Sequence, residues 1–317
     1  MNNKKNVSVI LRKYNTYMIL AICIIACIIV SSDFFTTTNI VNILRQYASL
    51  LVIALGMLFV IMTGGIDLSV GSYVALGSVV VALLLTNGVS MPYAIIITLL
   101  VGSAGGLMTG FFVAKLKMPS FIVTMAMMTI IRGMAFMISN GSPIKTPSET
   151  IERLGKGSLG IIPYLVILAL IIIVIASFVI AHTSFGRIVT GIGSNEQCIR
   201  LSGIRVNYYK IAVYIISAVC ATLAGIMAAS RTAVGTPLYG EGLELDAIAA
   251  CVIGGASLSG GEGSAVKTVV GVFILALIGN IMNLLSVPSY PQDVIKGVII
   301  IASILIQIFT SEKKKAV

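Results

Sequence analysis

The sequence predicts an all-α integral membrane protein, a polytopic bundle of about ten transmembrane helices that includes short or broken helices. Of the 317 residues, 58% are hydrophobic and only 10% are charged, whereas a soluble globular domain carries about 25% charged residues. The mean hydropathy is +1.07, and many uncharged stretches reach the roughly 20 residues that span a hydrocarbon core. Most of the surface must therefore contact membrane lipid, which is an expected partner.

Ten stretches form the candidate spans, and we treat 1–317 as one transmembrane domain. The uncharged run from 68 to 114 is too long for one crossing, and the turn residues Asn87, Gly88 and Pro92 divide it into two. At about 1.5 Å per residue, 245–256 is too short for a core of about 30 Å, which predicts a half-helix buried among its neighbours. In chain order, the spans are 14–32, 46–66, 68–86, 93–114, 118–138, 161–181, 211–230, 245–256, 266–285 and 294–311.

Charged residues next to the first and last spans predict the orientation of the chain. Lysines and arginines precede the first span, at Lys4, Lys5, Arg12 and Lys13, and three lysines follow the last, at 313–315. Because basic residues favour the cytoplasmic side, both termini are expected there. Two cytoplasmic ends require an even number of crossings, which ten satisfies. The same alternation places 139–160 outside and 182–209 in the cytoplasm.

The sequence lacks the residue clusters of an enzyme, a nucleotide site or a metal site. The glycine-rich run 261–267 has no Gly-Lys-Ser/Thr ending to hold a phosphate. His182 is the single histidine, and the five cysteines are scattered through mostly apolar stretches. The net charge of +10 comes from residues that flank spans, with no basic run interleaved with stacking aromatics. We expect no enzymatic activity, cofactor, metal or nucleic-acid partner.

A first candidate site is the motif Gly-Gly-Ile-Asp-Leu-Ser-Val-Gly at 64–71. Its glycines allow the backbone to break or pack closely, and the polar side chains can cap a helix that starts there. An aspartate bordering hydrocarbon is costly, so a helix break that lines a transport pathway is the alternative. We favour a mixture of these two roles, with the structural cap ahead of direct substrate binding. The candidate residues are Gly64, Gly65, Asp67, Ser69 and Gly71.

A weak internal repeat links this motif to the residues after the short span. The eight residues 254–261, which begin with Gly254 and Gly255, match 64–71 at five of eight positions. Duplicated halves are common in transporters. Chance similarity between two glycine-rich loops is an equally good explanation. Gly254 and Gly255 are therefore candidates for a second helix break.

Three further polar residues lie inside apolar spans. Arg132 is placed in mid-span, where insertion costs about 2.5–3.5 kcal/mol, so it should face the bundle interior or a wet cavity. It could bind a polar substrate or pair with an acid. Asn280 and Asn283 lie three residues apart on one helix face. Amides suit hydroxyl-rich substrates, but holding helices together is the role we favour.

The connection 182–209 predicts a short, rigid helix that faces the cytosol. Asn195 or Ser194 can cap a helix from Glu196 to Ser202, and Gly203 can end it. A solvated turn is the simpler interpretation, yet a defined helix between two spans suits a contact with a separate motor protein. The candidate residues for such a contact are Gly193, Asn195, Glu196, Arg200, Leu201, Ser202 and Gly203.

Three motifs in this order resemble the ribose-type sugar permeases of bacterial ABC importers. They are the motif at 64–71, Gly-Ser-Asn-Glu and Arg-Leu-Ser-Gly-Ile within 193–204, and Glu-Leu-Asp-Ala-Ile-Ala-Ala-Cys-Val-Ile-Gly-Gly-Ala-Ser-Leu-Ser-Gly-Gly at 244–261. The resemblance covers nearly the whole chain. It implies import of a monosaccharide, ribose or a similar pentose, across the bacterial plasma membrane. It also implies a cytoplasmic ATP-binding subunit, an extracytoplasmic sugar-binding protein and a second permease chain in a homodimer or pair.

The same resemblance makes the helix near Glu196 the coupling helix to the ATPase. Relatives often carry Glu-Ala-Ala where this chain has Glu196-Gln197-Cys198, so the contact with the ATPase differs in detail. An ion-coupled secondary transporter or channel, in which Asp67 binds the coupling ion, is the alternative function.

Overall fold

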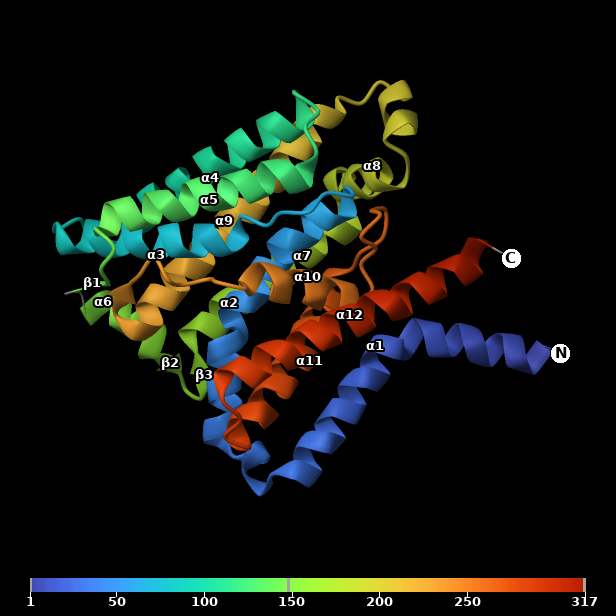
Figure 1. The fold of residues 1–317 in the computed structure, drawn as a ribbon, viewed down its shortest axis with the longest axis horizontal. Helices are drawn as coiled ribbons and strands as arrows, with labels where there is room; N and C mark the ends of the chain where they lie inside the picture. The colour runs from blue at the N-terminus through green and yellow to red at the C-terminus, as the bar shows by residue number, and fades with distance from the viewer. Residues whose placement is uncertain (1, 147–148, 316–317) are drawn as a thin grey trace.

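The computed structural model describes residues 2–146 and 149–315, which form a bundle of helices with a few two-residue strands (Figure 1). The helices are α1 (Asn2–Val30), η1 (Ser32–Phe35), α2 (Thr37–Met62), α3 (Val70–Thr86), α4 (Met91–Ala114), α5 (Ser120–Ser139), α6 (Glu149–Lys156), α7 (Tyr164–His182), α8 (Ser184–Leu201), α9 (Val206–Thr232), α10 (Leu243–Ile253), α11 (Ala265–Leu284) and α12 (Ser289–Lys315).

Two short antiparallel strand pairs lie at one end of the bundle. Strand β1 (Ile144–Lys145) pairs with β4 (Val234–Gly235), and β2 (Ser158–Leu159) pairs with β3 (Ile162–Pro163). Figure 1 shows these strands and α6 toward the left, whereas α8 and both chain ends lie toward the right. Both ends of the described chain are thus on the side of α8, the arrangement that an even number of crossings produces.

Each of the ten expected spans contains a helix, but several boundaries differ. Helix α2 begins at Thr37 rather than at 46, because the Thr36 hydroxyl accepts a hydrogen bond from the Asn39 amide and caps the helix. Six described helices are long and apolar enough to cross a membrane: α2, α4, α5, α7, α9 and α11. An all-α membrane protein is confirmed. The four other crossings, and hence the count of ten, stay a prediction.

Helix α9 is the centre of the bundle and packs against α2, α3 and α4. A stripe of Gly102, Gly106 and Gly110 on α4 allows close contact with α9. A Cβ added to Gly106 would lie 2.7 Å from the carbonyl oxygen of Tyr214, and one added to Gly110 would lie 2.7 Å from the Cα of Ile211. Small residues at spacing four let membrane helices approach at the backbone. Packing of backbone on backbone therefore fixes α9 against α4.

The chain breaks its helices in the middle of the bundle. Residues 63–69, between α2 and α3, are not helical, and α10 has 11 residues, about 16 Å of helix. Gly235 packs against the backbone of Ser78, and Gly240 packs against that of Gly71. Residues 235–240 thus run antiparallel along α3 and carry the chain inward to the start of α10. A short helix buried among its neighbours was expected at 245–256, and it lies at 243–253.

Helix α7 presents the most apolar surface of the described bundle. Its mean hydropathy is 3.2, and only 22% of its apolar window is buried inside the chain. The exposed side chains include Leu170, Val174 and Phe178. A side chain of this kind gains free energy in hydrocarbon. The α7 face is therefore suited to lipid contact.

Candidate functional site

Helix α8 is kinked at Asn195. That residue has φ −161° and ψ 94°, so a helical segment up to Ser194 is followed by a second segment from Glu196 to Leu201. The Asn195 Oδ1 accepts a hydrogen bond from the Cys198 amide at 3.0 Å, so Asn195 caps the second segment. Gly203 has φ +81° and follows its last turn. The short helix is therefore as expected, except that it continues directly from a helix beginning at Ser184 rather than from a loop.

Glu196 links this segment to α9. Its Oε1 accepts hydrogen bonds from Nη2 and Nε of Arg200 at 2.6 and 3.0 Å, and its Oε2 accepts one from the Lys210 Nζ at 2.5 Å. Burial by itself would raise the pKa of Glu196. The hydrogen bonds and charges of Lys210 and Arg200 outweigh that effect, so the pKa of Glu196 lies below its ordinary value.

The first segment of α8 rests on a junction of glycines. A Cβ at Gly193 would lie 2.0 Å from the carbonyl oxygen of Met62 and 2.3 Å from the amide nitrogen of Gly261. That amide donates a hydrogen bond of 3.0 Å to the same Met62 carbonyl. A Cβ at Gly260 would lie 2.7 Å from the amide nitrogen of Gly64. The two similar glycine motifs are therefore in contact with each other, and α8 packs against this junction.

Asp67 anchors the start of α3 to α9. Its Oδ1 accepts hydrogen bonds from the Ser69 amide at 3.0 Å and from the Ser69 hydroxyl at 2.5 Å, while its Oδ2 accepts one of 2.8 Å from the Ser217 hydroxyl. The residue is 1% exposed, and no described cation pairs with it. Asp67 therefore joins Ser69, the residue that precedes α3, to α9. Ser69 was expected to cap α3 as well, but its hydroxyl donates to Asp67 instead and caps nothing.

The other motif glycines mark close approaches between backbones. Gly71 lies against Gly240, where an added Cβ would be 2.2 Å from the Gly240 carbonyl oxygen. Gly254 packs against Lys267 at the start of α11, with 2.6 Å from an added Cβ to the Lys267 carbonyl oxygen. Gly65 lies against the Tyr214 hydroxyl, and Gly255 has φ +86° with open space around it. These positions hold the two broken segments against their neighbours.

Arg132 holds the inward-running segment of the α9–α10 connection. Its Nη1 donates to the carbonyl oxygens of Pro237 and Tyr239, both at 2.6 Å. It forms no ion pair within 4.0 Å with a described acid, although Glu241 and Glu244 are near enough to act on its charge. Pairing with an acid was one expectation for Arg132. The structure gives it backbone carbonyls instead, since these lie within reach of its mid-span position.

The two asparagines expected on one helix face join different partners. Asn280 of α11 and Asn39 of α2 exchange two hydrogen bonds, of 2.8 and 3.1 Å, through their side-chain amides. Asn283 accepts a hydrogen bond from the Gln292 amide at 3.0 Å. Asn280 therefore joins two helices, and Asn283 joins α11 to the start of α12.

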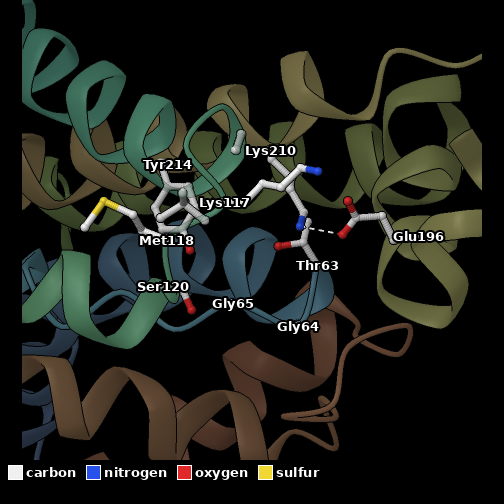
Figure 2. Close-up of a pocket in the computed structure, with 11 residues that line it drawn as sticks. Thr63, Gly64, Gly65, Lys117, Met118, Ser120, Glu196, Lys210 and Tyr214 are labelled. Carbon is white, nitrogen blue, oxygen red and sulfur yellow. Dashed lines mark hydrogen bonds and ion pairs between the residues drawn. The ribbon is translucent and has the colours of Figure 1, made fainter.

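Some residues of this region belong to none of the sequence motifs, and the sequence did not predict them as site residues. Lys210 and Tyr214 lie on α9, and Lys117 lies in the turn between α4 and α5. All three line a pocket of about 300 Å³ with Glu196 (Figure 2). The available signal was weak: Lys117 and Lys210 are simply basic residues at the ends of spans.

Comparison with known proteins identifies the family. Residues 39–304 match the family described as "Branched-chain amino acid transport system / permease component". The ribose import permease protein of Escherichia coli K12 is 41% identical over 280 residues, which cover 87% of each chain. The chain belongs to the ribose-type permeases of ABC importers. It is a permease component of a sugar transporter and not an enzyme, as expected from its lack of catalytic clusters.

Further members of this permease family match over most of their length. The ribose import permease protein of Bacillus subtilis 168 is 40% identical over 299 residues, 94% of this chain and 93% of the relative. The L-arabinose transport system permease protein of E. coli K12 is 34% identical over 305 residues, 96% of this chain and 93% of the relative. No solved structure matches the permease.

Proposed function

We propose that this permease imports a monosaccharide, ribose or a similar pentose, and that a separate cytoplasmic ATP-binding subunit powers it. The observation that carries the proposal is the capped segment 196–201, which directly follows the part of α8 that packs on the junction of both broken-helix connections. The relatives named above support the sugar class, because the most similar are named for ribose and others for L-arabinose.

The contacts of α8 suggest how force reaches the pathway. The ATPase closes on the segment 196–201, which is fixed to α9 through Glu196 and Lys210. Movement of α8 acts through Gly193 on the end of α2 and on the α10–α11 connection. Because packed interfaces have discrete arrangements rather than continuous ones, the bundle switches between two states of access.

The proposed pathway runs along the surface formed by Arg132, Glu241 and Glu244. Arg132 lies about 18 Å along α5 from Ser120, which is near the middle of a hydrocarbon core of about 30 Å. It is only partly buried, and Glu241 is exposed. Charges at that depth are too costly to face lipid, so this surface faces water, sugar or a second chain. Carboxylates and a guanidinium also suit a substrate rich in hydroxyl groups.

The proposed assembly follows from the family. Two copies of this chain form a homodimer whose charged surfaces enclose the pathway, while the α7 faces contact lipid. An extracytoplasmic sugar-binding protein delivers the sugar on the side of α6. The chain resides in the bacterial plasma membrane with both termini and α8 in the cytoplasm.

Reconstitution tests this function. Proteoliposomes are prepared with the permease, its ATPase subunit, the binding protein and labelled ribose, and each component is omitted in turn. We expect uptake only when both partners and ATP are present, with L-arabinose as a competing sugar. Uptake driven by an ion gradient in vesicles that lack the ATPase would support the alternative, in which Asp67 binds a coupling ion.

A further inference from the structure

The pocket beside Glu196 is a feature that sugar transport leaves unexplained. It lies between α8, α9, the α2–α3 connection and the α4–α5 turn, and its volume is about 300 Å³. Its polar lining consists of Thr63, Lys117, Ser120, Glu196, Lys210 and Tyr214 (Figure 2). Two ammonium groups and one carboxylate leave this lining with one excess positive charge.

One wall of the pocket carries a hydrogen-bond donor without a partner. The Tyr214 side chain is 1% exposed, and its hydroxyl, although near that of Ser120, has no hydrogen-bond partner within 3.5 Å among the described residues. It lies against Gly65, where an added Cβ would be 2.6 Å from the hydroxyl oxygen. A buried hydroxyl without a partner costs free energy, since it has lost its water. An acceptor supplied by a ligand would satisfy it.

Lys117, in the turn between α4 and α5, adds a second unusual feature to the pocket. It has φ +54°, the left-handed conformation that glycine normally occupies at the end of a helix. A lysine is strained in this conformation. A role for its ammonium group would explain why a lysine stands here in place of glycine. Figure 2 shows the Lys117 and Lys210 side chains extending toward Glu196.

The pocket also lies at the N-terminus of a long helix. Ser120 begins the 20-residue α5, whose N-cap is Pro119, so no side chain caps its first amides. The Ser120 hydroxyl accepts from the Ile66 amide instead. Free amides and the helix dipole favour an anion at such a position.

We propose that this pocket binds a phosphate group, with Lys117, Lys210 and the Tyr214 hydroxyl as donors. A phosphate has three acceptor oxygens and up to two negative charges, which matches donors that converge from α9 and the α4–α5 turn. It would compete with Glu196 for Lys210. A bound phosphate would therefore loosen the link between α8 and α9 and alter coupling to the ATPase.

Binding of inorganic phosphate to the full permease chain in phosphatidylcholine nanodiscs tests the site. Wild type should bind about one phosphate per chain. Tyr214→Phe and Lys117→Gly should each weaken binding about tenfold, the effect of losing one hydrogen bond to a charged group. Lys115→Gln is the control, because this neighbouring lysine lies outside the pocket and should leave binding unchanged.

Two further measurements separate ligand binding from folding and identify the source of the phosphate. Lys117→Gly should not lower the melting temperature, because glycine accepts the left-handed backbone. In phosphatidylglycerol nanodiscs, loss of phosphate binding assigns the site to a lipid headgroup, and retained binding assigns it to a soluble phosphate ester. Absence of saturable binding in phosphatidylcholine, or equal binding by wild type and both pocket variants, overturns the proposal.

Discussion

Gly193 of α8 lies against Met62 at the end of α2, so close that an added Cβ would be 2.0 Å from the Met62 carbonyl oxygen. Gly193→Ala should therefore displace α8 from the glycine junction and abolish coupled uptake. Gly191→Ala is the matched control, because its Cβ would meet only the flexible end of the Ile199 side chain. Sugar uptake in proteoliposomes is the measurement. Equal uptake by the two variants would contradict a role for this contact.

Glu196 should make stability depend on pH in a defined direction. Its pKa in the folded chain lies below the ordinary value of about 4.3. The stabilisation is therefore complete above that ordinary value, and it is lost as the pH falls through the folded pKa. We expect Glu196→Gln to melt at a lower temperature than wild type at pH 7, with a difference that shrinks below about pH 4.3.

The control for this pH profile is Glu149→Gln. The Glu149 and Arg153 side chains are 91% and 82% exposed and 4.0 Å apart, and such surface pairs contribute little. Its melting temperature should follow wild type at every pH. A Glu196→Gln difference that stays constant down to pH 3 would show that the carboxylate charge is not the cause.

Gly203 ends the capped segment with φ +81°, and a Cβ there would meet open space. A substitution at Gly203 thus acts through the backbone and not through a clash. Gly203→Val should reduce the sugar imported per ATP hydrolysed, because a β-branched residue disfavours this conformation. Gly203→Asn should retain most of the coupling, since asparagine tolerates the left-handed region. An unchanged ratio in the valine variant would exclude this backbone turn from coupling.

The buried bond between Asp67 and Ser217 should contribute to stability. Ser217→Ala removes one of three donors to a buried carboxylate and should lower the free energy of unfolding by about 1–3 kcal/mol. Ser177→Ala offers a matched control, because the Ser177 hydroxyl is buried without a partner. Its removal should be neutral or slightly stabilising. Thermal unfolding of the two variants side by side provides the comparison.

Local features of the fold were predictable because they depend on neighbouring residues. The apolar runs place the helices, and the Asn195 side chain with Gly203 limits the segment 196–201 in the way that caps usually do. The start of α2 was misplaced, since Arg45 interrupts the apolar run while the Thr36 cap lies further upstream.

Contacts across the bundle were not predictable in the same way. Arg132 binds carbonyls more than 100 residues away, and hydropathy says nothing about which backbone lies beside it. The contact between Gly64 and Gly260 likewise depends on the tertiary fold. The Gly102, Gly106 and Gly110 spacing on α4 was a usable signal for close packing, although it does not reveal that α9 is the partner.

The central claim is that the capped end of α8 contacts a separate ATPase, and Cys198 provides a direct test. It is the one exposed cysteine among the described residues, and it lies in the segment 196–201. In the assembled transporter, a thiol-directed photo-crosslinker at Cys198 should join the permease to the ATPase subunit, whereas the same reagent at Ser158→Cys in a Cys198→Ser chain should not. No ATPase adduct from Cys198, with one from position 158, would contradict the claim.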